Sequence, residues 1–342
     1  MGRQGRTAPA CGARRHASRS FAKLLALAAC CVGVIPAPHA AESERTYPAK
    51  PIRLIVPYPA GAGTDTTART VAAKLAERWG HQVVVDNRTG AGGAIAIEST
   101  ANANPDGYTL CLITASQAVS AASGQKLPYD LRKDLRPIVQ VTSLFYVVYH
   151  PPSLPVKSVK ELIAYAKTNP GKLNFASSGV GSLQHVAGEL LNHMAGIKLV
   201  HVPYRGAASI ITAMLANEVQ VGFNSMFGVR PQVQAGRLRW IAITAPKRSP
   251  VVDLPTVAES GLPGFEVAQW YGIVTSVRTP TPIVAKVNAA VGEILQAPEV
   301  GQRLTADGSE LVGGTPEQFA ANITSDIEKW RKLVKAANLQ LN

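Results

Sequence analysis

Hydrophobic and polar positions along this chain alternate between the short apolar runs of buried strands and the spacing of amphipathic helices. Apolar runs at residues 52–57, 82–86 and 108–114 predict strands. Between the first two runs, apolar residues keep helical spacing until Gly80 ends the pattern: Ala68, Val71, Ala72, Leu75 and Trp79. We therefore expect an α/β fold in which a mainly parallel sheet is flanked by helices.

A second series of the same kind follows residues 144–149, an apolar run that ends at two prolines and leads out of the first series. Its predicted strands lie near residues 173–176, 198–202, 219–223 and 240–244. Ser158 and Glu161 form a capping-box sequence at the start of one helix, and Ser182 is placed to cap the next.

The chain then returns to the first series. Residues 270–276 predict a return strand after a Pro- and Gly-rich stretch, and two long amphipathic helices follow, the last of which begins at Thr315-Pro316-Glu317-Gln318. Two crossings between two α/β lobes imply a hinge and a cleft. We place lobe one at residues 46–148 plus 269–342 and lobe two at residues 149–268.

The first forty residues differ from the rest. An apolar run at residues 24–35 follows six basic residues with no acidic residue, which is typical of a secretory signal peptide. We expect residues 1–40 to be removed near Ala40 and the exported protein to be periplasmic. A rival interpretation takes residues 27–30 as a lipobox and leaves a lipid anchor on Cys30.

Loss of this leader changes the charge and cysteine content. The formal charge falls from +13 to +7, because six basic residues leave, and Cys111 is the one cysteine that stays. A single cysteine excludes an intramolecular disulfide and a thiol-rich metal site. The remaining positive charge is scattered, without the stripe that nucleic-acid binding requires, and it favours small anionic ligands.

Residues 57–65 (Pro-Tyr-Pro-Ala-Gly-Ala-Gly-Thr-Asp) join the end of a predicted strand to the start of a helix. Small residues let a ligand approach the backbone there, and the free amides and dipole of a helix N-terminus favour an anion. The sequence is neither a Walker loop nor a regular dinucleotide fingerprint. The structural alternative is a tight turn in which Thr64 or Asp65 only caps the helix.

Residues 177–182 (Ser-Ser-Gly-Val-Gly-Ser) form an equivalent loop in lobe two, and two such loops facing a cleft suggest a ligand held from both sides. His185 follows within the next helix and either faces the cleft or packs in the interior. Arg205 is a carboxylate partner or an ordinary surface residue. Residues 87–93 are a further Gly-rich loop whose glycines serve backbone turns.

Catalytic and metal-binding sequence patterns are absent. The chain has no Gly-x-Ser-x-Gly elbow, no His-Glu-x-x-His and no Cys/His cluster with metal spacing. Asp65 is a poor general base, since a helix N-terminus lowers the pKa of a carboxylate. We expect no enzyme activity, no cofactor and no metal.

The order of these segments resembles the substrate-binding receptors of tripartite tricarboxylate transporters, also called Bug-type extracytoplasmic solute receptors. The likeness runs from about Tyr47 to the last helix and includes residues 57–69, 87–93, 105–110, 176–182 and 201–206. It implies a two-lobed periplasmic-binding-protein fold (type II) with two hinge crossovers that closes on its ligand. It also implies a carboxylate ligand, such as a tri- or dicarboxylate, an acidic amino acid or an aromatic acid.

The resemblance further implies which residues contact the ligand. Carried onto this sequence, the contacts fall at Tyr58, Ala60, Gly61 and Asp65 in lobe one and at Ser178, Gly179 and Ser182 in lobe two. Second choices are Ser116, Tyr204 and Asn224. The expected partners are the membrane permease subunits of such a transporter, and we expect a monomer.

Departures from the family pattern leave the ligand open. Ala62 stands where the family usually has glycine, and Asn224 stands where many relatives have aspartate. Loss of that negative charge would tolerate a more anionic ligand. Alternative functions are a two-lobed periplasmic enzyme acting on a carboxylate and the effector-type sensor domain of a regulator.

Overall fold

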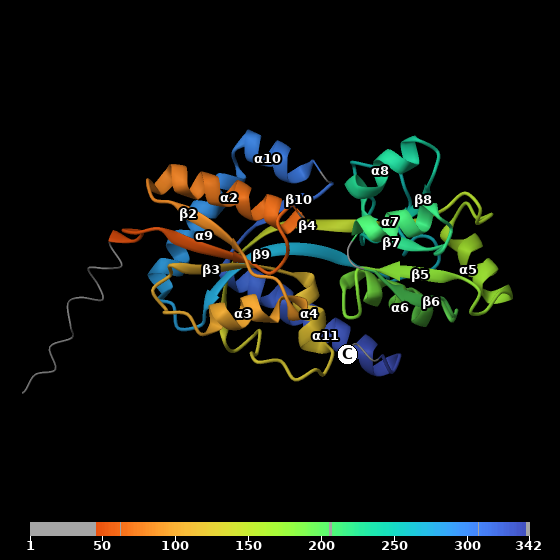
Figure 1. The fold of residues 1–342 in the computed structure, drawn as a ribbon, viewed down its shortest axis with the longest axis horizontal. Helices are drawn as coiled ribbons and strands as arrows, with labels where there is room; N and C mark the ends of the chain where they lie inside the picture. The colour runs from red at the N-terminus through yellow and green to blue at the C-terminus, as the bar shows by residue number, and fades with distance from the viewer. Residues whose placement is uncertain (1–45, 62, 205–206, 307, 340–342) are drawn as a thin grey trace, which may run out of the picture. The chain divides into compact units, whose positions relative to one another are not determined.

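The computed structural model describes residues 46–61, 63–204, 207–306 and 308–339, and the chain from Thr46 onward forms one compact unit. Residues 1–45, with the predicted leader and Cys30, lie outside the described residues, as does Arg205. All of the structure below belongs to the compact unit (Figure 1).

Three parallel strands begin the fold. The three strands predicted from the apolar runs are present, and β1 (Ile52–Val56) lies between β2 (Val83–Asn87) and β3 (Thr109–Thr114). Leu54, Ile55 and Val56 expose no surface, which explains why this strand is apolar without alternation. The connections are α2 (Gly63–Trp79), the short helix η1 (Ala91–Gly93) with α3 (Ala94–Ala101), and then α4 (Ala115–Ala122) after β3.

Antiparallel strands extend this sheet. β9 (Ala268–Ser276) pairs with β3 and with β4 (Leu135–His150), and β10 (Glu310–Gly313) pairs with β4 at the edge. The apolar run at 144–149 is therefore only the end of a longer strand. The sequence did not predict the first part of β4, because it contains Pro137 and proline donates no hydrogen bond to a neighbouring strand. Pro137 lies where the register between β4 and β9 shifts.

The same strand β4 enters a second group of strands. Its final residues, Tyr146–His150, pair with β7 (Gly222–Ser225) and β8 (Arg239–Ile243), while β5 (Asn174–Ser177) pairs in parallel with β6 (Val200–Pro203). The predicted strands of this part are confirmed to within a few residues. The predicted boundary at residues 148 and 149 falls inside β4 and stays a prediction.

The helices of this second part are α5 (Val159–Thr168), α6 (Leu183–Ala195), α7 (Ala207–Leu215) and α8 (Met226–Gln234). Ser158 caps α5 as predicted, by accepting a hydrogen bond from the Glu161 amide. The predicted reciprocal bond is different, because the Glu161 carboxylate accepts from the Lys157 amide, 2.8 Å away. Ser182 caps α6, since its hydroxyl accepts from the His185 amide.

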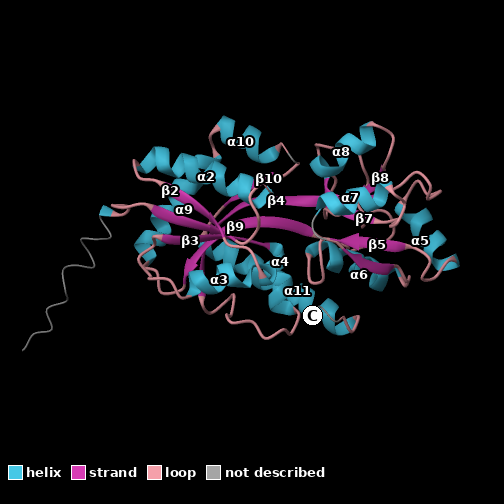
Figure 2. Cartoon of the chain, viewed as in Figure 1, coloured by secondary structure: helices cyan, strands magenta, loops and turns pink. Residues whose placement is uncertain are grey.

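The C-terminal region contains α9 (Thr281–Leu295), α10 (Pro298–Thr305) and α11 (Pro316–Ala336). The two predicted long helices are α9 and α11; α10 and β10 between them were not predicted. Thr315 and Gln318 make both bonds of the predicted capping box. α2, α9 and α10 pack together on one face of the first sheet, and α4 and α11 pack together on the other (Figures 1 and 2).

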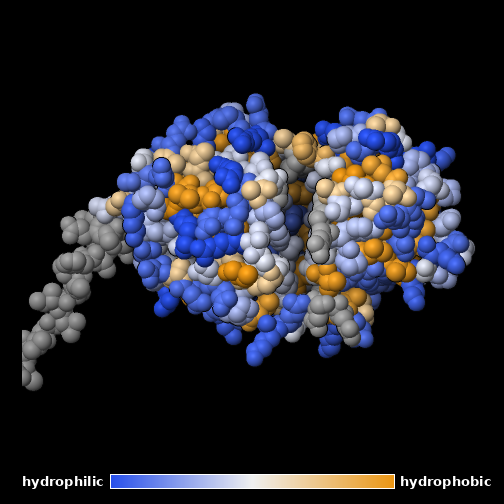
Figure 3. Space-filling view, in the orientation of Figure 1, coloured by the Kyte–Doolittle hydropathy of each residue, from blue (hydrophilic) through white to orange (hydrophobic). Residues whose placement is uncertain are grey.

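A groove runs across the surface of the unit between its two groups of strands (Figure 3). The core of the first group extends into α5 and α6 of the second, while α7 and α8 cover a separate apolar cluster. Within the described residues, none of the helices has the length and apolar character needed to cross a membrane.

Candidate functional site

Three loops of the first sheet meet at one edge. β2, β1 and β3 are adjacent and parallel, so the segments that follow β1, β2 and β3, at residues 57–61, 88–93 and 115–116, leave from the same end of the sheet. Helices α2 and α4 begin at this edge, and the first amides of a helix have no partner within the helix itself. The geometry suits an anion at this edge.

Asp65 ties the first of these loops to β2. Its Oδ2 atom accepts hydrogen bonds from the Gly61 amide and from Arg69 Nε, both 2.9 Å away, and its Oδ1 atom accepts from Asn87 Nδ2 at 3.0 Å. Asn87 Nδ2 also donates to the Tyr58 carbonyl at 3.0 Å. Asp65 thus fixes the loop from within α2, and the role of helix cap that the sequence left open for Thr64 or Asp65 stays a prediction.

The charge state of Asp65 follows from these partners. Burial acts to raise the pKa of the carboxyl, but the hydrogen bonds from Arg69, Gly61 and Asn87 outweigh it and hold the pKa below its ordinary value. The side chain is 4% exposed, so its oxygens are directed to protein partners. A direct contact between Asp65 and a ligand stays a prediction.

Gln117, in α4, connects the loop that contains Tyr58 with the loop that contains Gly92. Its Nε2 atom donates to the Tyr58 hydroxyl and to the Gly92 carbonyl, both at 3.1 Å, and its Oε1 atom accepts from the Thr114 amide at 2.7 Å. Thr114 Oγ1 accepts from the Ser116 amide at 3.2 Å and lies 3.3 Å from the Tyr58 hydroxyl. The structure therefore brings Tyr58 and Ser116 together.

Glycine at position 93 is required by this arrangement. Its φ is +96°, and a Cβ there would lie 2.9 Å from both Gln117 Nε2 and Pro57 Cβ. The Gly-rich loop thus serves a backbone turn, as expected, and at the same time allows Gln117 to reach the Gly92 carbonyl. The sequence pattern Thr114-x-x-Gln117 is a capping box and could have revealed Gln117.

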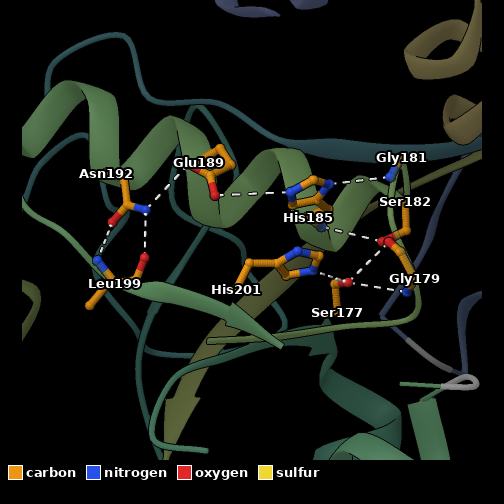
Figure 4. Close-up of polar contacts among 9 residues, drawn as sticks. All are labelled: Ser177, Gly179, Gly181, Ser182, His185, Glu189, Asn192, Leu199 and His201. Atoms are coloured by element: carbon orange, nitrogen blue, oxygen red, sulfur yellow. Dashed lines mark hydrogen bonds and ion pairs between the residues drawn. The ribbon is translucent and has the colours of Figure 1, made fainter. Parts of the chain in front are cut away.

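The loop at residues 177–182 begins at the last residue of β5 and is held by side chains beside it (Figure 4). Ser177 Oγ accepts from the Gly179 amide at 3.1 Å, and Ser178 Oγ donates to Gln184 Oε1 at 2.9 Å. The Gly181 amide donates to His185 Nδ1 at 3.2 Å. Three of the predicted contacts therefore lie in one loop that hydrogen bonds hold in place: Ser178, Gly179 and Ser182.

His185 has the interior role that the sequence left as one of two alternatives. It is 5% exposed, and its ring stacks on that of His201 with a centroid separation of 3.8 Å and an interplanar angle of 11°. Burial, followed by the neighbouring His201, lowers the pKa of His185 to about 4, and burial lowers the pKa of His201 to about 4. Ser177 and His201 lie in segments that the sequence analysis singled out, residues 177–182 and 201–206, but neither was among the predicted contacts.

Of the two second-choice residues of this part, Tyr204 contacts the same loop and Asn224 lies at the end of β7. The Tyr204 amide donates to the Ser177 carbonyl at 2.8 Å, while its hydroxyl donates to Glu218 Oε2 at 3.3 Å. Asn224, at the end of β7, is 6% exposed and accepts from the Ser225 amide at 2.8 Å. Burial raises the pKa of the Tyr149 phenol, and the neighbouring Asn224 side chain lowers it in part. Among the described residues, Asn224 Nδ2 has no acceptor within hydrogen-bond geometry.

Tyr146 lies between the two groups of loops. It faces Ser225 across the β4–β7 register, and burial, together with the neighbouring Tyr271 and Tyr58, raises the pKa of its phenol. The Tyr271 hydroxyl in turn lies close to Gly63 at the start of α2, 3.1 Å from where a Cβ would stand. Side chains of the central strands therefore connect the loop around Tyr58 with the end of β7.

A cavity of about 350 Å³ lies away from these loops, where β4 passes from one group of strands to the other. It is lined by residues 143–145 and 245–249 together with Glu266, Ala268 and Glu310, and none of the predicted contacts lines it. We place the candidate site at the loops, because helix N-termini and amides meet there, whereas this cavity carries exposed charges of both signs. Within the described residues, no group of three His, Cys, Asp or Glu side chains could hold a metal ion.

Comparison with known proteins identifies the chain. The sequence model described as tripartite tricarboxylate transporter family receptor, TctC, matches residues 67–339. The chain belongs to the TctC receptor family. Protein BugT of Bordetella pertussis is 35% identical to this TctC receptor over 304 residues, which cover 87% of the chain and 93% of BugT.

Solved structures of similar proteins agree. Rpa4515 of R. palustris, solved with adipate, is 33% identical, with a TM-score of 0.78 over 85% of this chain and 98% of its own. MatC of Rhodopseudomonas palustris, solved with bound malate, is 32% identical, with a TM-score of 0.75 over 84% of this chain and 100% of its own. The predicted family, the α/β periplasmic-binding fold and the role of a solute receptor are thereby confirmed for this TctC receptor.

Proposed function

We propose that this receptor captures a small carboxylate in the periplasm and delivers it to the membrane permease subunits of a tripartite tricarboxylate-type transporter. The observation that carries the proposal is the convergence of three loops and two helix N-termini at the edge of β2, β1 and β3. Amides and dipoles of this kind bind anions without a cationic side chain. The carboxylate ligands of Rpa4515 and MatC support the same chemistry.

Loop backbone and hydroxyl groups would make the contacts. In the first group of strands we assign them to Tyr58, Ala60 and Gly61, with Ser116 beside them. Asp65 supports them from below, since its carboxylate already accepts three hydrogen bonds. Its lowered pKa makes it a weak proton acceptor, which fits a receptor that releases its ligand unchanged.

The second group would supply Ser178, Gly179 and Ser182, with Tyr204 and Asn224 as further candidates. Gly179 and Gly181 direct their amides toward Ser177 and His185, while the amides of Ser178 and Val180 take no part in those bonds. These two amides are the groups that we expect a second carboxylate, or the far end of the ligand, to engage.

A ligand screen tests the proposal. The protein without residues 1–40 is screened for a rise in melting temperature with mono-, di- and tricarboxylates, acidic amino acids and aromatic acids. Affinities of the responding acids then follow by isothermal titration calorimetry. Failure of every acid to shift the melting temperature would exclude the proposed function.

Variants of serine locate the binding. Ser178→Ala should weaken binding of the responding acid by up to about tenfold, because it removes the hydrogen bond to Gln184 that helps to hold the Ser178 amide in place. Ser153→Ala is the matched control, because its hydroxyl is exposed and bonds to Asn217 outside these loops. Equal affinities for both variants would place the ligand elsewhere.

A further inference from the structure

Two histidines from different elements meet under the loop at residues 177–182. His185 belongs to α6 and His201 to β6, and their stacked rings pack beside Phe175 of β5, whose centroid lies 5.0 Å from that of His201. Phe175 is fully buried and His185 nearly so. Figure 4 shows both imidazoles beside the loop.

Each ring contacts the loop through one nitrogen atom. His185 Nδ1 accepts the hydrogen bond from the Gly181 amide, and His201 Nε2 lies 2.6 Å from Ser177 Oγ, which itself accepts from the Gly179 amide. Gly179 and Gly181 have φ values of +131° and +75°, which side-chain-bearing residues rarely adopt. The two glycines therefore permit the conformation of the loop, and the contacts with His185 and His201 stabilise it.

We propose that the neutral His185–His201 pair positions this loop for ligand binding, and that protonation of the pair releases the loop and weakens binding. The proposal rests on the proposed function, since it assigns the loop to the ligand. His185 and His201 are positioning residues in this scheme, because they act through the amides of the loop.

The hydrogen bond from Gly181 requires neutral His185. Nδ1 can accept an amide proton only while it has a free lone pair, and both nitrogens of an imidazolium are donors. Protonation would thus set an N–H group against the Gly181 amide. A second proton on His201 would add a positive charge in the ring stacked at 3.8 Å.

Few other charges surround the pair. α6 packs against β5, β6, β7 and α4, and among these neighbours His201 is the titratable side chain. On α6 itself, Glu189 Oε1 lies 3.9 Å from His185 Nε2, and exposed His193 lies about two turns further on. Burial raises the pKa of Glu189, so the carboxylate that could stabilise an imidazolium is itself neutralised as the pH falls.

The direction of the pH effect follows from the lowered pKa values. A released histidine has its ordinary pKa of 6.5, while the held one has a pKa of about 4, so the held state is fully favoured above pH 6.5 and loses ground as the pH falls toward 4. For one histidine, protonation at pH 5 favours the released loop on the order of thirtyfold relative to pH 7.5. We expect the affinity for a responding acid to fall about tenfold between pH 7 and pH 5.

The test compares the pH dependence of binding in matched variants. His185→Asn keeps an acceptor near the position of Nδ1 but cannot take up a proton, so we expect its affinity to change less than threefold over the same range. The same acid is titrated against both proteins, and its own ionisation therefore cancels. His193→Gln removes an exposed histidine of the same helix and should retain the wild-type dependence.

Hydrogen exchange without ligand separates this proposal from the proposed function. Protection factors of the Gly179 and Gly181 amides should fall between pH 7 and pH 5 in the wild-type protein and stay constant in His185→Asn. A protein that binds no acid but shows this loss would refute the proposed function alone. Equal pH dependence of affinity in both proteins, or constant protection of Gly181 in the wild type, would overturn the role of the histidine pair.

Discussion

Replacing Asp65 by alanine removes the acceptor that joins the loop at residues 57–61, α2 and β2. The Gly61 amide and Asn87 Nδ2 then lose their hydrogen-bond acceptor at a position where Asp65 is only 4% exposed. Hydrogen bonds to a buried charge contribute about 1.5–3 kcal/mol each. We take the lower end of this range for each of the two bonds.

The expected loss is therefore about 3 kcal/mol in the free energy of unfolding at pH 7. Arg69 receives no share of this estimate, because its side chain is half exposed and its ion pair is screened by solvent. Asp65→Asn keeps one acceptor oxygen and should lose about half as much. Urea unfolding followed by tryptophan fluorescence measures both variants against the wild type.

The pH dependence provides the sharper check. The folded pKa of Asp65 is depressed below its ordinary 3.8, so its contribution to stability is present above pH 3.8 and is lost as the pH falls through the folded pKa. The difference between wild type and Asp65→Ala should be constant from pH 8 to 5 and should shrink below pH 4. A difference under about 0.5 kcal/mol at pH 7, or one unchanged at acidic pH, would refute the assigned role.

Two further predictions concern the core. Gly188→Ala in α6 should destabilise the protein by about 2 kcal/mol or more, because the new Cβ would lie 2.1 Å from Phe175 Cε2. Its control, Gly292→Ala in α9, meets no atom within 4 Å and should stabilise the protein by about 0.5–1 kcal/mol. Thermal unfolding compares the two variants, and similar effects would contradict the packing at Phe175. Asp326→Ala should lower the free energy of unfolding by about 1–3 kcal/mol, since Trp270 Nε1 donates to Asp326 Oδ2 at 2.6 Å in the core. Urea unfolding measures this loss, and a neutral result would show that the indole finds another acceptor.

Much of the fold could be predicted from local pattern. The strands β1, β3 and β9 and the helix α2 follow from apolar runs and helical spacing, because those patterns record which face of an element is buried. The caps at Ser182 and Thr315 were equally accessible, since a cap needs residues only three positions apart. The local rule that proline interrupts a strand failed at Pro137, because pairing with the distant strand β9 keeps this part of β4 extended.

The candidate site could be predicted only as a set of loops. The sequence by itself determined which segments follow strands and carry small or hydroxyl residues, such as 57–65 and 177–182. Only the tertiary structure decided that Asp65 bonds to Asn87, 22 positions away, and that His185 stacks on His201 from another element. The physical reason is that these contacts depend on strand order and on how helices lie against the sheet, and local periodicity records burial but not the identity of the neighbour.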